Sequence, residues 1–249
     1  NGELHKPYIC TEHGNAQKPS VYARNTVFLS RKHADNHGAE CFVYNGLNWD
    51  EYGAPSLDKP GSYAIFLGKC SAPHKNMMGA IDIAKASQKQ IWVLGGNRLN
   101  PKRKPPLLLS RHVKFCGMVG GERKNNIIKQ AQALVFPVRW HEPFGLAVIE
   151  SLYLGVPVIA TPYGSLPEII NDPSVGLLSD SYATLGAALN NLSQYDRTAC
   201  HELARDKFSG LQMHIGYQQC YEQVLDGAPL NRDEPKCEGG LLDLLDIKD

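Results

Sequence analysis

Two carboxylates stand eight residues apart in the segment RWHEPFGLAVIE at 139–150, where Glu142 precedes Pro-Phe-Gly and Glu150 lies in an apolar run. Pro143 suits the first position of a helix, since its φ is fixed near the helical value and its missing N–H is not needed there. The free N–H groups of a first helical turn attract an anion, and Gly145 lets a ligand approach the backbone. In a regular helix the Cα atoms of Glu142 and Glu150 are about 12 Å apart. The two carboxylates can then bind separate hydroxyl-rich parts of one extended ligand; the alternative is a purely structural pair.

A regular alternation of strand-like and helix-like segments must position these residues. Short β-rich runs occur at 62–68, 91–96, 112–117, 133–138 and 156–161, and helical spacing occurs between them at 76–88, 122–132 and 143–154, and later at 182–192. This pattern predicts an α/β fold with a mostly parallel sheet and helices on both faces, because parallel strands need crossover connections. Such sheets bind ligands beyond the carboxyl ends of their strands. Glu142 follows the run 133–138 and is expected at that edge.

The rest of the chain predicts a second, smaller part. Residues 1–50 contain three strand-like runs at 7–14, 25–38 and 40–46, too few for an independent domain, and we interpret them as the last portion of another Rossmann-like unit. Residues 51–61 read as a linker, 62–208 as the main domain, and 209–225 as a helix that can return to the first part. The acidic stretch 226–249, interrupted by Pro and Gly, is predicted to be an exposed tail.

Charge and cysteine usage limit the classes of function. The net charge is +1, but residues 1–129 hold 19 Lys and Arg against 9 Asp and Glu, and residues 130–249 hold 7 against 16. One part can therefore face an anion, or the two charged faces are simply solvated. Neither a nucleic-acid partner nor a transmembrane segment is indicated, and seven scattered cysteines without a C-x-x-C pair fit a reducing cytoplasm. His33 and His37 lack a third metal ligand and are expected on a surface helix.

Three ordered segments resemble a known family. HEPFGLAVIESLYLGVPVIATPYGSLPEII, FLGKCSAPHKNMMGAIDIA and FLSRKHA with VYNGLN are similar to the signature segments of glycosyltransferase family 4, the retaining glycosyl transferases group 1 with two Rossmann-like domains in the GT-B fold. The agreement covers nearly all of 7–225 and is far more specific than any single motif. Members generally carry a full first domain, much of which has no counterpart here. A fragment of a longer enzyme, a chain completed by another chain, and a donor-binding module are the three interpretations.

The resemblance implies roles for individual residues. Glu142 would contact hydroxyls of the transferred sugar, and Glu150 would contact the ribose of a nucleotide-sugar donor. Lys75, at a predicted helix start where a cation is disfavoured without an anion, would bind the diphosphate together with Lys69, which replaces the usual Arg. His13 would face the donor sugar across the interdomain cleft. Further donor-binding positions are Gly68, Gly117, Val119, Phe144, Gly145 and Leu146. Gly164, Ser165 and Glu168 would line the cleft, with a structural role as the alternative for Glu168.

The function that we expect is retaining transfer of a sugar from a nucleotide diphosphate sugar, a UDP-sugar first, to a hydroxyl acceptor of saccharide, lipid-linked or small-molecule type. The chain contains no D-x-D motif, so we expect no metal and no other cofactor, with lysines and helix amides taking the metal's place. The alternatives are a nucleotide-sugar-binding module without transfer activity and a sugar phosphorylase of the same architecture, for which no pyridoxal phosphate lysine is identified. A cytoplasmic location, with peripheral contact at the inner face of a membrane as an option, fits this function.

Overall fold

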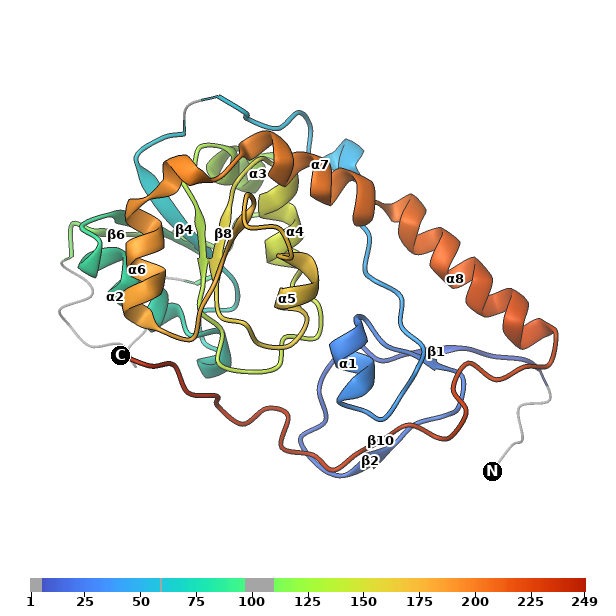
Figure 1. Ribbon diagram of the computed structural model, residues 1–249. Helices are drawn as coiled ribbons and strands as arrows, with labels where there is room; N and C mark the ends of the chain where they lie inside the picture. Colours follow the sequence, from blue (N-terminus) through green and yellow to red (C-terminus); the bar gives the residue numbers. More distant parts are fainter. Residues whose placement is uncertain (1–5, 59, 97–109) are drawn as a thin grey trace.

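The computed structural model describes residues 6–58, 60–96 and 110–249, and its centre is a six-stranded parallel sheet (Figure 1). The strand order is β6-β5-β4-β7-β8-β9, and every neighbouring pair is parallel. The strands are β4 (Tyr63–Leu67), β5 (Gln90–Leu94), β6 (Val113–Gly117), β7 (Leu134–Phe136), β8 (Val158–Ala160) and β9 (Gly176–Leu178). The predicted α/β class with a parallel sheet is confirmed. The edge strand β9 was not predicted, because its residues, one glycine and two leucines, do not form a β-rich run.

Helices cover both faces of this sheet, because successive strand residues point to opposite sides. Ile65, Leu134 and their neighbours pack against α3 (Gly121–Lys129), α4 (Leu146–Tyr153) and α7 (Arg197–Lys207). Phe66, Val135 and their neighbours pack against α2 (Met77–Ala86) and α6 (Tyr182–Asn190). Short helical turns complete the domain at α5 (Leu166–Ile169) and at the 3-10 segments Trp49–Glu51, Pro73–Lys75 and Leu192–Gln194. The predicted helices lie within a few residues of their observed positions.

The N-terminal part is a small layer beside the main sheet, and the helix that follows α7 covers it (Figure 1). In it β1 (Cys10–Thr11) pairs in parallel with β3 (Thr26–Val27), and the short helix α1 (Arg31–Asp35) follows. Helix α8 (Gly210–Leu225) places Cys220 and Val224 against Val27 and Val43. The hydroxyls of Thr11 and Tyr217 lie 3.0 Å apart across this contact. The helix at 209–225 thus returns to the N-terminal part.

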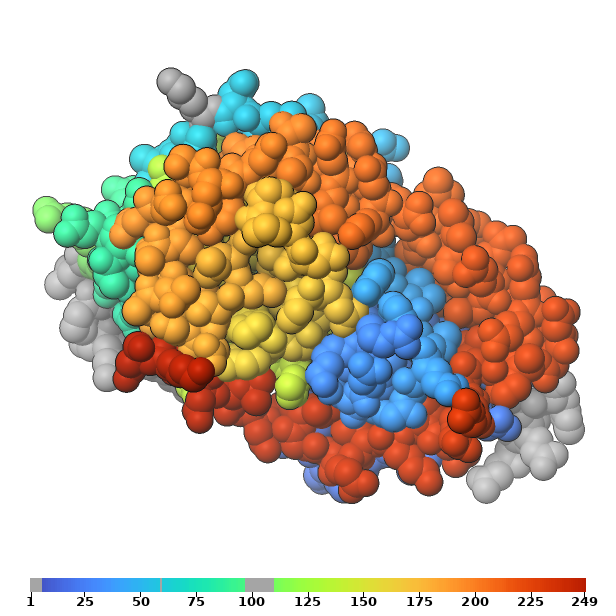
Figure 2. Space-filling view, viewed as in Figure 1, coloured from blue at the N-terminus to red at the C-terminus, as the bar shows by residue number. Residues whose placement is uncertain are grey.

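The acidic segment 226–249 differs from the exposed tail that its composition predicts. It runs under the N-terminal part, where β10 (Lys236–Cys237) pairs antiparallel with β2 (Ser20–Val21), and continues to the main domain (Figures 1 and 2). The buried Asn231 fixes the start of this segment. The Asn231 side-chain amide donates to the carbonyls of Arg24 and Thr26, and its oxygen accepts from the N–H groups of Glu40 and Cys41, all at 2.8–2.9 Å. A single amide that satisfies four backbone groups holds a polar segment that lacks a hydrophobic pattern.

The prediction that His33 and His37 lie on a surface helix is wrong, because both rings are buried against Phe28. The Nδ1 atom of His33 accepts a hydrogen bond from the Leu29 N–H at 3.2 Å, and its Nε2 lies 2.8 Å from the Gly14 carbonyl oxygen. The aromatic contacts and paired ring nitrogens make burial of a polar ring possible. Burial lowers the pKa of His33 to about 4 and also lowers that of His37. Among the described residues no cluster of three or more His, Cys, Asp or Glu forms a metal site.

Candidate functional site

A cavity of about 430 Å³ lies where the N-terminal part meets the carboxyl edge of the sheet. It brings together seven of the predicted site residues, namely His13, Gly68, Lys75, Glu142, Phe144, Gly145 and Leu146. Leu67 and Phe136, at the ends of β4 and β7, line the same cavity, so it opens at the strand ends where such sheets bind ligands. A hollow of about 560 Å³ between Trp92 and Arg123 contains none of the predicted residues.

The loop between β7 and α4 forms one wall of this cavity. Gly145 has φ +98° and is the N-cap of α4, so the helix begins at Leu146 and not at Pro143. A left-handed residue cannot continue a helix, so the predicted helix start at Pro143 is wrong, and the regular-helix spacing of Glu142 and Glu150 does not apply. No side chain of the described residues caps α4. The N–H groups of Leu146 and Ala147 at the cavity wall remain available to a ligand, since the first backbone bond of the helix is from Val148 to the Gly145 carbonyl.

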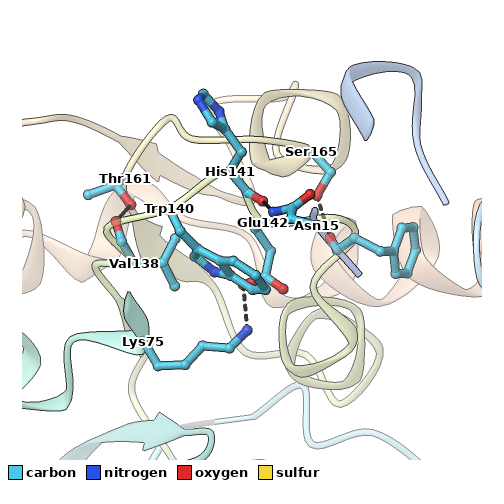
Figure 3. Close-up of polar contacts among 9 residues, drawn as sticks. Asn15, Lys75, Val138, Trp140, His141, Glu142, Thr161 and Ser165 are labelled. Carbon is cyan, nitrogen blue, oxygen red and sulfur yellow. Dashed lines mark hydrogen bonds and ion pairs between the residues drawn. The ribbon is translucent and has the colours of Figure 1, made fainter. Parts of the chain in front are cut away.

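Glu142 is the most buried carboxylate of the predicted site, with 5% of its surface exposed. Its Oε2 accepts a hydrogen bond from Lys75 Nζ at 2.6 Å and another from the indole N–H of Trp140 at 2.9 Å (Figure 3). The Lys75 ammonium also lies over the Trp140 ring, 4.8 Å from its centroid. A buried charge is tolerated when it is paired and hydrogen-bonded, and Glu142 has both kinds of partner.

Local backbone structure brings Lys75 to this carboxylate. Lys75 ends the 3-10 turn Pro73–Lys75, and Asn76 follows in the left-handed region at φ 54°. The Asn76 side chain caps α2 by accepting from the Gly79 N–H at 3.1 Å and donates to the Pro137 carbonyl at 2.8 Å. This second bond fastens the loop after β4 to the end of β7. Burial, together with the neighbouring Lys75 charge, lowers the pKa of His74.

Residues of the N-terminal part close the cavity from the other side. His13 is exposed and lines the cavity opposite the β7–α4 loop. The Asn15 amide donates to the His141 carbonyl at 2.5 Å (Figure 3), and the buried Ser30 hydroxyl donates to the Pro143 carbonyl at 2.8 Å. Both bonds reach the backbone on either side of Glu142. Lys69, in contrast, is exposed and does not line the cavity.

Glu150 lies outside the cavity lining, about one turn into α4, and its carboxylate is already paired. Its Oε1 accepts from the Tyr52 hydroxyl at 2.5 Å and forms an ion pair with Lys124 of α3. Burial and the bond to Glu150 raise the pKa of Tyr52. The partners come from the linker and from α3, so three separate segments meet at this carboxylate.

Of the residues predicted to line the cleft, Gly164 and Glu168 line a hollow between α1 and the main domain that is separate from the cavity. Together with Ser165 they also support the surrounding loops. A Cβ on Gly164 would lie 2.2 Å from the backbone N of Glu142, so the two backbones touch. Ser165, fully buried, donates from its N–H to the Glu142 carbonyl at 2.9 Å and from its hydroxyl to the Phe144 carbonyl at 2.6 Å. The Glu168 carboxylate accepts from two N–H groups at the start of α1, at 2.7 and 2.9 Å, and from the Tyr44 hydroxyl at 2.8 Å.

Gly117 ends β6 and Val119 follows it, and neither residue lines the cavity. Gly117 has φ 77° and its carbonyl accepts from the Gly95 N–H at 2.9 Å, while Val119 is half-buried against the core. Sequence reasoning missed Trp140, which donates to Glu142, and Asn15 and Asn76, which fasten the loops. Of these, Trp140 had a signal, because an aromatic donor two residues before a site carboxylate can reach it.

Comparisons with known proteins agree on one family. The model of the family described as glycosyl transferases group 1 matches residues 55–205. A phosphatidyl-myo-inositol mannosyltransferase of Mycobacterium tuberculosis is 27% identical over 145 residues, which are 55% of this chain and 38% of that protein. An uncharacterised glycosyltransferase of Methanocaldococcus jannaschii is 28% identical over 197 residues, 74% of this chain and 54% of that protein. The matches thus span about two-fifths to a half of the curated relatives.

Solved structures show the same architecture. The glycosyltransferase AviGT4, involved in avilamycin A biosynthesis, superposes with a TM-score of 0.74 at 21% identity over 89% of this chain and 69% of that one. HepE of Anabaena, solved with UDP and glucose, superposes with a TM-score of 0.65 at 17% identity over 81% of this chain and 63% of that one. No helix among the described residues is long and apolar enough to cross a membrane. With a family model matching more than half of its length, this chain belongs to the glycosyl transferases group 1 and has the GT-B type of α/β fold, as the sequence motifs predict.

Proposed function

We propose that the cavity binds a nucleotide diphosphate sugar, a UDP-sugar first, and that the enzyme formed with this chain transfers the sugar to a hydroxyl acceptor with retention at the anomeric carbon. The observation that carries the proposal is the Lys75–Glu142 pair beside the uncapped start of α4 in one cavity. Support comes from the mannosyltransferase relative and from HepE, whose structure holds UDP and glucose.

The ammonium of Lys75 suits the diphosphate of such a donor, and the carboxylate of Glu142 suits its sugar. The diphosphate would lie near the Lys75 ammonium and the N–H groups of Leu146 and Ala147, where a helix start favours an anion. These groups would also stabilise the charge of the departing nucleoside diphosphate. The sugar hydroxyls would donate to Glu142, since a buried carboxylate accepts more strongly than a neutral oxygen. His13 would contact the sugar from the opposite wall.

Retention is proposed to proceed by attack of the acceptor on the face that the diphosphate leaves. In that geometry a phosphate oxygen of the leaving group takes the acceptor proton, and no protein nucleophile is required. The protein's part is to orient donor and acceptor and to hold positive charge at the phosphates. Because Lys75 and helix N–H groups supply that charge, we expect transfer to continue in the presence of EDTA.

Calorimetric titration of UDP, GDP and ADP into the chain tests donor binding. The substitution Lys75→Met removes one charged donor, which is worth about 1.5–3 kcal/mol, so diphosphate affinity should fall by roughly ten- to a hundredfold. Lys85→Met, at the other end of α2, is the matched control and should leave the affinity unchanged. Equal affinities for wild type and Lys75→Met would contradict the placement of the diphosphate.

A donor and acceptor panel with NMR analysis of the product anomer tests the reaction. The donors are UDP-glucose, UDP-N-acetylglucosamine and GDP-mannose, and the acceptors include saccharides and phosphatidylinositol. We expect a product with the donor's anomeric configuration. An inverted product would refute the mechanism, and donor binding without transfer to any acceptor would favour a binding module.

A further inference from the structure

The hydrogen bonds to Glu142 are unevenly distributed between its two carboxylate oxygens. Lys75 Nζ at 2.6 Å and Trp140 Nε1 at 2.9 Å both donate to Oε2, and no described residue donates to Oε1. A carboxylate oxygen has two lone pairs, so the protein itself saturates Oε2. Oε1 keeps both acceptor sites for a ligand.

Trp140 is held so that its N–H has little freedom. The residue is 8% exposed, its ring contacts the His74 ring at a centroid distance of 4.2 Å, and the Lys75 ammonium covers it at 4.8 Å. The Arg139 N–H before it donates to the His74 carbonyl at 2.8 Å and fixes the backbone. Because this donor is buried, fixed and uncharged, its bond to Oε2 fixes the orientation of the Glu142 carboxylate and therefore the direction in which Oε1 points.

Lys75 differs from Trp140, because it has two further N–H groups to offer an arriving anion. Its side chain is 19% exposed, against 6% for that of Glu142. If Lys75 turns toward a diphosphate, the negative charge of Glu142 loses part of its ion pairing. A buried carboxylate without another fixed donor would then reorient or require a water molecule as its hydrogen-bond partner. Trp140 remains as a donor that no anion can draw away.

We propose that Trp140 is a positioning residue: its indole N–H holds Glu142 so that Oε1 accepts hydroxyls of the donor sugar while Lys75 is free to bind the diphosphate. The inference rests on the proposed function and deepens it. It separates two kinds of recognition, since Trp140 acts through Glu142 on the sugar, whereas Lys75 acts on the phosphates.

The test compares the affinities of UDP and UDP-glucose, or of GDP and GDP-mannose if GDP is preferred, by calorimetry. Trp140→Phe removes the N–H, and replacement of Trp140 by benzothienylalanine removes it with the bicyclic shape retained. We expect each variant to lower the affinity for the nucleotide sugar about tenfold more than the affinity for the diphosphate, as for a lost bond to a charged group. Trp92→Phe, in β5 and outside the cavity, is the control and should change neither affinity.

Two results would overturn the inference without touching the proposed function: unchanged affinities for both ligands in the benzothienylalanine variant, or an equal loss of both affinities, which a merely structural role produces. Failure of the wild type to bind any nucleoside diphosphate would overturn the proposed function and the inference together. A selective loss of the nucleotide sugar supports the inference, and thermal unfolding of each variant confirms that it is folded.

Discussion

Gly164 offers a quantitative test of how the site loop is held. A Cβ at this position would lie 2.2 Å from the backbone N and 2.3 Å from the backbone O of Glu142, and the φ of Gly164 is +68°. The substitution Gly164→Ala therefore adds a left-handed alanine, at about 1–2 kcal/mol, and overpacking against rigid backbone, at about 1–3 kcal/mol. The expected loss is about 2–5 kcal/mol, a large part of a typical stability of about 5–15 kcal/mol.

Urea and thermal denaturation followed by circular dichroism measure the loss of stability in Gly164→Ala. A second glycine with positive φ separates the backbone cost from the overpacking cost. Gly227 has φ +83°, and an added Cβ meets nothing within 4 Å, so Gly227→Ala carries the backbone cost alone. For a chain of this size each kcal/mol lowers Tm by about 2–4 °C. We expect Gly164→Ala to lower Tm clearly more than Gly227→Ala.

The same substitution should displace Glu142, because the backbone bond from the Ser165 N–H to the Glu142 carbonyl at 2.9 Å joins the two loops. Nucleotide-sugar affinity should then fall in Gly164→Ala and remain unchanged in Gly227→Ala. If the two variants lose equal stability, the contact between the loops does not constrain the site and the reasoning fails.

Substitutions at Glu168 and Lys75 test the paired charges, and the pH dependence of stability tests the buried histidines. Glu168→Ala should cost about 1–2 kcal/mol, because the first N–H groups of α1 lose their acceptor. Lys75→Met should destabilise by up to about 3–5 kcal/mol, since it leaves a buried carboxylate unpaired, and adding Glu142→Gln should restore part of the loss. Burial lowers the pKa of His33 to about 4, so below pH 6.5 the unfolded chain binds more protons than the folded chain. The contribution of His33 to the free energy of unfolding is therefore fully present above pH 6.5 and falls by about 1.4 kcal/mol per pH unit toward pH 4. His37, whose pKa is also lowered, adds to this loss.

Urea midpoints give the two stability differences, and a series between pH 4 and 7 gives the pH dependence. Glu202→Ala, on the exposed face of α7, is the control for Glu168 and should be close to neutral. Wild-type stability that is flat below pH 6.5 would show that the two buried rings are not kept neutral by the fold. A double variant at Lys75 and Glu142 no more stable than Lys75→Met would show that the lysine contributes packing and not charge compensation.

The sheet could be predicted from the sequence because its signals are local. Apolar runs such as Ala64–Leu67 and Ile91–Leu94 are bounded by turns, and the helices between them repeat every three to four residues. The strand β9 and the segment 226–249 lack such signals. Asn231 holds that segment through four bonds to residues 190–207 positions away, and no pattern within the segment reveals it.

The cavity could be predicted to the level of the loops but not of each carboxylate's partners. Glu142 and Glu168 both follow strands at the same edge of the sheet, and their local sequences do not distinguish them. Glu142 meets a lysine in the cavity, whereas Glu168 caps α1, which lies more than 130 residues earlier in the chain. Long-range packing therefore decides which carboxylate can bind a ligand and which supports the fold.

The uneven charge of the sequence acquires a physical meaning from these partners. Acidic side chains of the second half meet donors of the first half: Glu142 meets Lys75, Glu150 meets Lys124, and Glu168 meets the start of α1. Buried ion pairs of this kind add little net stability, because desolvation offsets attraction. Separating such a pair is nevertheless costly when the carboxylate is left unpaired, so a lysine can turn toward an arriving phosphate only where its carboxylate keeps another donor. Glu142 has that donor in Trp140, which is why we expect Lys75 to move between Glu142 and the ligand without unfolding of the loop that carries Glu142. The Glu150–Lys124 pair lies outside the cavity, and with Tyr52 it joins the linker to α3.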